Sequence, residues 1–202
     1  MTKRIWIIDG SYLYKSTPER FDYLRLKNEL QTILGITFTE LYYFNSRMPR
    51  STPAQLSFNK WLQTAEPIGP QLIVKLFDVK RIFSRCNECQ QQSERYIQKG
   101  VDVGIVTQIF KLLKRSQVER LTLCAGDSDF SSALEALNEN NIQIDIAGFR
   151  ETMATELQQW GNVVWVDDFW GKIKKQESAR PRIHHDEERH HTDEERHHTR
   201  WE

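Results

Sequence analysis

The sequence predicts an α/β fold in which a mostly parallel β-sheet is covered by helices on both faces. Short apolar segments of strand length alternate along the chain with longer segments that carry apolar residues at helical spacing. The short segments are apolar on both sides, which is typical of strands buried between two layers of helices. A length of 202 residues fits one domain of this kind, a Rossmann-like three-layer α/β/α sandwich, with an appendage.

Each expected strand is a short apolar segment bounded by turn-forming residues. The first, RIWIIDG, ends at Gly10, where the chain is expected to turn. The expected strands are residues 4–10, 39–45, 72–80, 120–125, 143–149 and 163–168.

The segments between these strands are expected to be helical, and several of their ends carry recognisable signals. Gly35 follows the first helix as a stop signal, and Pro53 opens the second. The third places Ile105 and Ile109 on one side, and an Asp or Ser cap begins the fourth. The expected helices are residues 20–34, 53–65, 101–113, 130–140 and 152–160. The polar stretch that follows the third strand, through Lys99, shows no regular pattern.

Charges are distributed unevenly between a body, residues 1–175, and a tail, residues 176–202. The whole chain holds 28 basic and 28 acidic residues, and this balance alone argues against a protein that coats nucleic acid or membranes. From His184 onward, however, seven acids oppose three arginines, so the body carries a modest positive surplus. A nucleic-acid partner is therefore compatible with the composition.

The tail repeats the pattern HHDEER and is expected to be disordered. From His184 it contains no aliphatic residue with which to build a core. All six histidines lie there in pairs, and paired imidazoles bind transition metals. Weak binding of such metals and a merely solvated linker are both open interpretations.

The apolar segments and the cysteines predict a cytoplasmic protein with no membrane contact. No apolar run approaches the roughly 18 residues that a membrane span needs, and no signal-peptide pattern begins the chain. Three cysteines are an odd number, which favours reduced thiols. Cys86 and Cys89 have the spacing of half a zinc site. They either stabilise a turn as free thiols or share zinc between the subunits of a homo-oligomer.

Four aspartates are expected near the carboxyl ends of the strands, where open parallel sheets form their sites. Asp9 ends the first strand, Asp127 and Asp129 follow the fourth, and Asp102 lies in the first turn of a helix. If the first and fourth strands are neighbours, the four carboxylates converge and repel one another unless a cation lies among them. Oxygen ligands favour Mg²⁺ or Mn²⁺, and such a site can hydrolyse a phosphodiester. The alternative is that each aspartate only caps a helix.

Three segments that contain these aspartates resemble one known family. IWIIDGSYLY, KGVDVGIV and CAGDSDF, in this order, are similar to the NYN domain, in particular to the LabA-like (DUF88) branch of the PIN-like nuclease superfamily. The resemblance implies a Rossmann-like α/β/α sandwich and divalent-metal-dependent ribonuclease activity on single-stranded or structured RNA. The positions that match the acidic residues of the family are Asp9, Asp102, Asp127 and Asp129, and Lys99 matches a basic position.

Further residues near the aspartates are candidates for RNA binding. Ser11, Tyr12 and Ser128 adjoin the acids, and Lys99 is expected near a phosphate. Family members often carry Asn where this chain has Tyr12, which could stack on an unpaired base or pack inside the protein. Ser11 could supply a substitute polar group. This departure leaves a second function open, that of a catalytically weak regulatory protein that binds RNA or a protein partner.

Basic residues gather between Leu72 and Gly100. They either track a phosphate backbone or form an ordinary solvated surface. The six are Lys75, Lys80, Arg81, Arg85, Arg95 and Lys99.

Overall fold

A computed structural model describes residues 2–17, 19–85, 91–115 and 117–175. The tail from residue 176 and the pair Cys86 and Cys89 lie outside the described residues, so the expectations for them stay predictions.

The described chain contains a large sheet of six strands, all parallel, in the order β3-β2-β1-β6-β7-β8. The α/β prediction is confirmed, and each of the expected strands is found. The strands are β1 Lys3–Asp9, β2 Glu40–Arg47, β3 Ile73–Asp78, β6 Val118–Cys124, β7 Gln143–Gly148 and β8 Asn162–Trp165.

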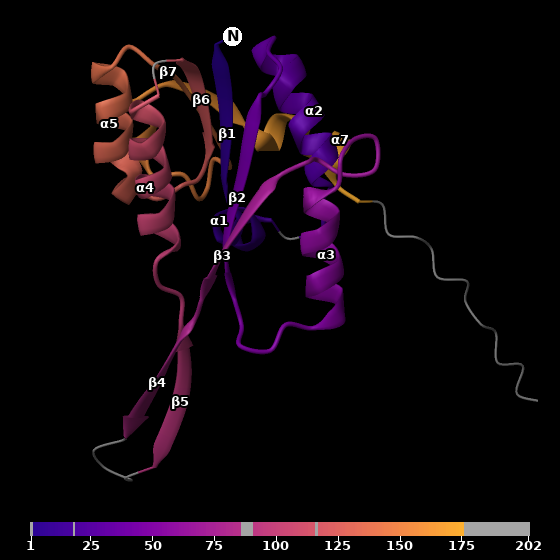
Figure 1. Ribbon diagram of the computed structural model, residues 1–202, viewed down its shortest axis with the longest axis vertical. Helices are drawn as coiled ribbons and strands as arrows, with labels where there is room; N and C mark the ends of the chain where they lie inside the picture. Colours follow the sequence, from indigo (N-terminus) through magenta and orange to yellow (C-terminus); the bar gives the residue numbers. More distant parts are fainter. Residues whose placement is uncertain (1, 18, 86–90, 116, 176–202) are drawn as a thin grey trace, which may run out of the picture.

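Helices cover both faces of this sheet, as Figure 1 shows, with α4 and α5 on one side and α2, α3 and α7 on the other. Strand β1 contributes to both cores because its side chains alternate. Ile5 and Ile7 pack with the residues of α4 and α5, whereas Trp6 and Ile8 pack with those of α2. The helices are α1 Gly10–Ser16, α2 Tyr23–Leu34, α3 Pro53–Gln63, α4 Val101–Leu113, α5 Ser131–Glu139, α6 Thr155–Gln158 and α7 Trp170–Ile173.

The order of the strands places a topological switch point between β1 and β6. The chain builds β1, β2 and β3 outward in one direction and then crosses back to add β6 on the other side of β1. Ile7 pairs with Tyr42 of β2 on one side and with Leu123 of β6 on the other. The expectation that the first and fourth expected strands are neighbours is therefore confirmed. Open α/β sheets bind ligands beyond the strand ends at such a point.

The polar stretch that was expected to be irregular forms a hairpin instead. Strands β4 (Lys80–Arg85) and β5 (Gln92–Ile97) pair with each other in antiparallel fashion and form a sheet of their own. Figure 1 shows the hairpin projecting from the end of the molecule at which β1 meets α1, which is the carboxyl edge of the large sheet. Its residues are mostly exposed, so the sequence lacks the apolar pattern of a core strand there.

Several element boundaries also differ from those expected. Helix α1 was missed because it is short and follows a strand directly. The third strand ends at Asp78 rather than continuing to residue 80, and the sixth gives way to a 3-10 helix at Val166. The helix expected at 152–160 is one turn, Thr155–Gln158. Gly35 ends α2 in the left-handed conformation with φ 64°, as the stop signal predicted.

None of the helices in the described part of the chain is both long and apolar enough to cross a membrane.

Candidate functional site

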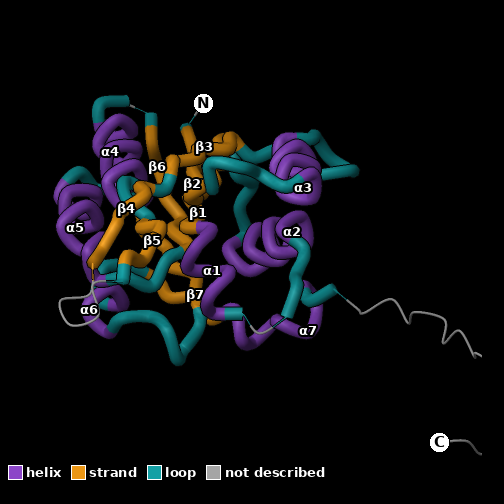
Figure 2. Tube along the Cα trace, turned by 90° about the horizontal axis from the view of Figure 1, so that it is seen from below, coloured by secondary structure: helices purple, strands orange, loops and turns teal. Residues whose placement is uncertain are grey.

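A cleft of about 710 Å³ lies at the carboxyl edge of the sheet, at the switch point. Figure 2 views this edge, with α1 near the middle and the hairpin strands β4 and β5 beside it. The cleft brings together three of the predicted acids, Asp9, Asp102 and Asp127, and three of the predicted binding residues, Ser11, Tyr12 and Ser128. Asp129 and Lys99 do not line it.

Asp9 is buried at the junction between β1 and α1, with 5% of its surface exposed. Its Oδ1 accepts hydrogen bonds from the Ser11 backbone N–H at 2.9 Å, the Ser11 hydroxyl at 2.7 Å and the Tyr12 N–H at 3.1 Å. Asp9 is thus the N-cap of α1, which is the structural role weighed against a catalytic one. Since the bonds engage one oxygen, the cap and a role in the cleft are compatible.

Asp102 reaches the cleft from the first turn of α4. Gly100 precedes this helix with φ 90°, a conformation that suits glycine because it lacks a Cβ. Burial raises the pKa of the Asp102 carboxyl, and the negative charges of Asp9, Asp127 and Asp129 raise it further, while Lys15 opposes them. The smaller contributions to this shift come from the other three aspartates, which lie near enough to act on Asp102.

Asp127 and Asp129 lie in the turn between β6 and α5. The Asp127 Oδ1 accepts a hydrogen bond of 3.1 Å from the Asp129 backbone N–H and so caps the 3-10 helix η1, Ser128–Phe130. The cap expected for the following helix belongs to this short element, and α5 begins at Ser131 with no side-chain cap. Asp127 and Asp129 are both exposed.

Tyr12 lines the cleft but packs against the protein, so its ring is not free to stack on a nucleobase. Its hydroxyl accepts hydrogen bonds from the Phe149 backbone N–H at 2.9 Å and from the Thr152 hydroxyl at 3.2 Å. Burial raises the pKa of its phenol. A Cβ at Gly126 would overlap the Tyr12 ring, and a Cβ at Gly148 would overlap its hydroxyl. The packing alternative therefore describes Tyr12, while Tyr14 is 80% exposed and lies outside the cleft lining.

The arrangement of the acids bears on whether they can hold a metal ion. Within the described residues, no group of three or more Asp, Glu, His or Cys side chains is placed so that it could hold a metal ion. The donor set nevertheless suits a hydrated Mg²⁺, which commonly binds through one or two carboxylates and keeps several waters. Mutual repulsion around Asp102 is the condition that such a cation relieves.

The cleft also contains residues that the sequence did not predict. Lys15 comes from α1, Gln98 from the segment after β5, and Glu151 and Thr152 from the loop after β7. The Gln98 amide donates a hydrogen bond of 3.1 Å to the Ser11 hydroxyl. Glu151 and Thr152 follow the strand next to β6, so the strand-end rule would have found them had the strand order been known.

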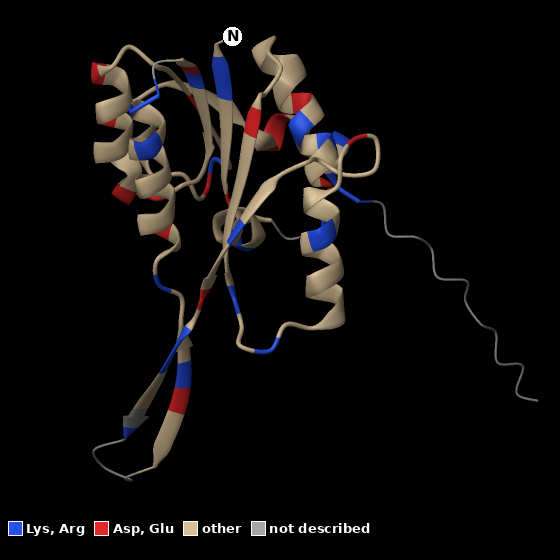
Figure 3. Ribbon diagram, in the orientation of Figure 1, with Lys and Arg blue, Asp and Glu red and all other residues tan. Residues whose placement is uncertain are grey.

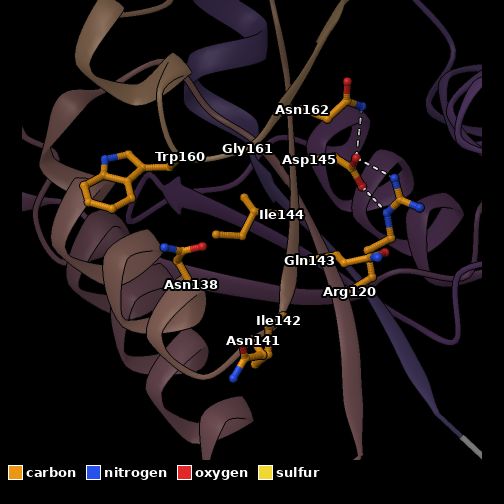
Figure 4. Close-up of a pocket in the computed structure, with 10 residues that line it drawn as sticks. All are labelled: Arg120, Asn138, Asn141, Ile142, Gln143, Ile144, Asp145, Trp160, Gly161 and Asn162. Carbon is orange, nitrogen blue, oxygen red and sulfur yellow. Dashed lines mark hydrogen bonds and ion pairs between the residues drawn. The ribbon is translucent and has the colours of Figure 1, made fainter.

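A second cavity, of about 530 Å³, lies at the opposite end of the sheet and has a structural explanation. Its buried acid, Asp145, is fully partnered, as Figure 4 shows. Arg120 donates to both carboxylate oxygens at 2.6 and 2.7 Å, Asn162 donates to Oδ1 at 3.1 Å, and Thr122 donates to Oδ2 at 3.2 Å. These bonds join the first residues of β8 to β7 and β6.

The remaining described cysteine, Cys124, is buried in β6 as expected. It is a free thiol that accepts a hydrogen bond of 3.1 Å from the Trp6 indole, and burial raises its pKa to about 12. A thiol with so high a pKa stays protonated and is unsuited to redox chemistry or to metal binding at neutral pH.

Comparisons with known proteins agree with this fold. A family model, the NYN domain, matches residues 4–163. A protein of unknown function from Vibrio parahaemolyticus has a solved structure similar to this one, with a TM-score of 0.59 and 20% identity over 83% of this chain and 94% of that chain. At this identity the likeness shows the fold alone. MurG from Acinetobacter baumannii matches more weakly, with a TM-score of 0.37 and 12% identity over 78% of this chain and 38% of that one. No curated protein matches the sequence.

Proposed function

This chain belongs to the NYN domain family, and on that premise we propose that it is a divalent-metal-dependent ribonuclease that hydrolyses phosphodiester bonds of RNA. The family is one for which a nuclease role is inferred and whose nucleases typically depend on metal ions. The proposal further specifies RNA as the substrate, Mg²⁺ or Mn²⁺ as the cation, and the catalytic residues named below. A cytoplasmic location, suggested by the cysteine usage, also remains part of it.

The observation that supports the proposal most strongly is the meeting of Asp9, Asp102 and Asp127 in one cleft at the switch point. They come from the end of β1, the start of α4 and the turn after β6, which are far apart in the sequence. Burial is the main cause of the raised pKa of Asp102, and the charges of Asp9, Asp127 and Asp129 add to it. Structural caps alone do not require such convergence.

In the proposed reaction, one or two of these aspartates would hold a hydrated cation. The others, together with Asp129, would add negative charge around it. When bound, the cation would activate a water molecule and offset the charge of the scissile phosphate. Lys15 lines the same cleft and would contact a phosphate oxygen. Lys99, the basic residue that matched the family, precedes Gly100 and would act from the rim of the cleft.

A second candidate function is that of a catalytically weak NYN protein that regulates by binding RNA or a protein. Two observations favour it. Tyr12 stands where relatives often carry Asn and is occupied in packing, and no group of three potential ligands among the described residues could hold a metal. This alternative predicts binding without cation-dependent cleavage.

Cleavage of labelled RNA by the purified protein separates the two functions. We expect the wild type to cleave with Mg²⁺ or Mn²⁺ and to stop when EDTA is added. Asp127→Asn should abolish the cleavage, because it removes a charge while keeping an oxygen that can accept the Asp129 N–H. If the wild type and the variant show the same trace activity, the enzyme proposal is wrong and the regulatory function gains support.

A further inference from the structure

The β4–β5 hairpin is a surface that the proposed catalytic cleft does not use. It extends away from both helical layers and from the large sheet (Figure 1). Its described strands bury little in the body, and Phe83 and Tyr96 are 57% and 43% exposed. Large aromatic side chains exposed on a projecting arm need an explanation beyond folding.

The pairing register sorts the side chains of the arm onto two faces. Arg81 pairs with Tyr96, Phe83 with Glu94, and Arg85 with Gln92. Because neighbouring residues on a strand point to opposite faces, these six side chains share one face of the hairpin. That face, which we call the aromatic face, carries two arginines and two aromatic rings, with Phe83 between Arg81 and Arg85 on β4.

Arg81 and Glu94 contact each other and the two rings of the aromatic face, and both rings stay partly exposed. The Arg81 guanidinium lies 4.6 Å from the centre of the Phe83 ring and also forms an ion pair with Glu94. Glu94 in turn hydrogen bonds with Tyr96, and this bond raises the pKa of the Tyr96 phenol. The one acid on the face is thus engaged by its neighbours.

The charge of the arm is mainly positive. Lys80, Arg81, Arg85 and Arg95 lie on its described strands, against the single acid Glu94 (Figure 3). Exposed aromatic rings between basic side chains are what proteins use to bind single strands, since the rings stack on bases while the cations contact phosphates. A protein surface offers no comparable repeat of negative charge and flat rings.

The arm leads directly into the catalytic cleft. Tyr96 lies two residues before Gln98, a spacing of about 7 Å in extended chain, and Gln98 lines the cleft and donates to the Ser11 hydroxyl. Four residues after Gln98 comes Asp102. A strand of nucleic acid that lay along the arm would therefore enter the cleft at its acids.

We propose that the aromatic face of the β4–β5 hairpin binds single-stranded RNA by base stacking on Phe83 and Tyr96 and feeds it into the cleft. The direction toward the cleft rests on the proposed ribonuclease function, whereas the binding itself does not.

Fluorescence anisotropy with a labelled 12-nucleotide oligouridine in EDTA measures binding without cleavage. The test variant is Phe83→Ala/Tyr96→Ala, and the control is Phe110→Ala, which removes an aromatic ring 45% exposed on α4, in the body. We expect the double variant to bind about 10- to 100-fold more weakly, as loss of two stacking rings implies. Phe83→Trp/Tyr96→Trp should keep the wild-type affinity, and thermal melts should show that all variants fold.

The same measurement with a 12-base-pair duplex RNA identifies what the rings do. Stacking predicts a much smaller effect of the double variant on duplex binding. Unchanged single-strand affinity, equal losses for both RNAs, or no binding by the wild type would each overturn the proposal. The proposal would also be overturned if the wild type sedimented as a dimer and the double variant as a monomer while RNA affinity stayed unchanged. The arm would then bind a second copy of the chain. Arm-dependent binding by a wild type that cleaves nothing would uphold this inference and sink the ribonuclease function.

Discussion

The hydroxyl of Tyr12 accepts a 2.9 Å hydrogen bond from the backbone N–H of Phe149, 137 residues further along the chain. The bond ties the helix that follows β1 to the end of β7, across the strand that lies between them. Tyr12 therefore has a structural role in this chain. It also lines the cleft in which Asp9 and Asp127 meet.

Removing this hydroxyl should cost stability. Tyr12→Phe leaves the N–H of Phe149, a residue only 8% exposed, without its acceptor. We expect the free energy of unfolding in urea to fall by about 1–2 kcal/mol. Tyr14→Phe is the matched control, because Tyr14 is 80% exposed and should change stability by less than about 0.5 kcal/mol. Equal effects of the two changes would contradict this role for Tyr12.

A methyl group at Gly126 should disrupt the packing of Tyr12 against this glycine. Its Cβ would overlap the Tyr12 ring and approach the carbonyl oxygen of Thr152. Gly126→Ala should therefore destabilise the protein by about 1–3 kcal/mol. Gly171→Ala is the control, since nothing lies within 4 Å of the Cβ position there. Thermal unfolding of both variants checks the difference, and equal stability of the two variants would contradict the close packing at Gly126.

The buried ion pair at the opposite end of the sheet should be sensitive to loss of one partner. Arg120→Met leaves the Asp145 carboxylate, which is 0% exposed, without its cationic partner and with only neutral hydrogen-bond donors. A cost of about 3–5 kcal/mol is expected at neutral pH. Arg47→Met breaks an ion pair with Asp78 whose side chains are 51% and 69% exposed, and it should cost far less because solvent screens exposed pairs. If denaturant titrations give equal losses of unfolding free energy for the two variants, the Arg120–Asp145 pair does not have this stabilising role.

Stability should depend on pH through Asp102. Its pKa is raised in the folded state, so ionisation of this group lowers the free energy of unfolding as pH rises through the folded pKa. Asp102→Asn cannot ionise, and it should be more stable than the wild type at pH 7 in the absence of divalent cations. The advantage should shrink on acidification below the ordinary pKa of aspartate, near 4. Melting temperatures of both proteins between pH 3 and 7 test this prediction. A difference between variant and wild type that stays constant over this range would contradict a raised pKa of Asp102.

The large sheet could be predicted because burial on both faces leaves a strong signal. Ile7 and Ile8 lie on opposite sides of β1 and are both fully buried, so the run that contains them is continuously apolar. The hairpin left no such signal, since Phe83 and Tyr96 face solvent and its strands pair only with each other. Helix α1 was hidden because Asp9 both ends a strand and caps the helix.

Part of the cleft could be predicted and part could not. Asp9 and Asp127 follow strands, so the strand-end rule identified them without the strand order. Glu151 becomes relevant only once β7 is known to lie beside β6, and Gln98 only once the hairpin is known to return the chain to the cleft. Tyr12 was open between stacking and packing because the choice depends on Phe149, which lies far along the chain.

The most direct test of the central claim compares two aspartates with the same structural role. Asp9 and Asp22 each cap a helix by accepting two backbone N–H bonds, but only Asp9 lines the cleft. Asparagine also caps helices well, so both Asp→Asn variants should fold. We predict that Asp9→Asn abolishes Mg²⁺- or Mn²⁺-dependent RNA cleavage at saturating protein while Asp22→Asn cleaves at the wild-type rate. Cleavage by Asp9→Asn at the wild-type rate would contradict the claim that the acids of this cleft carry out the reaction.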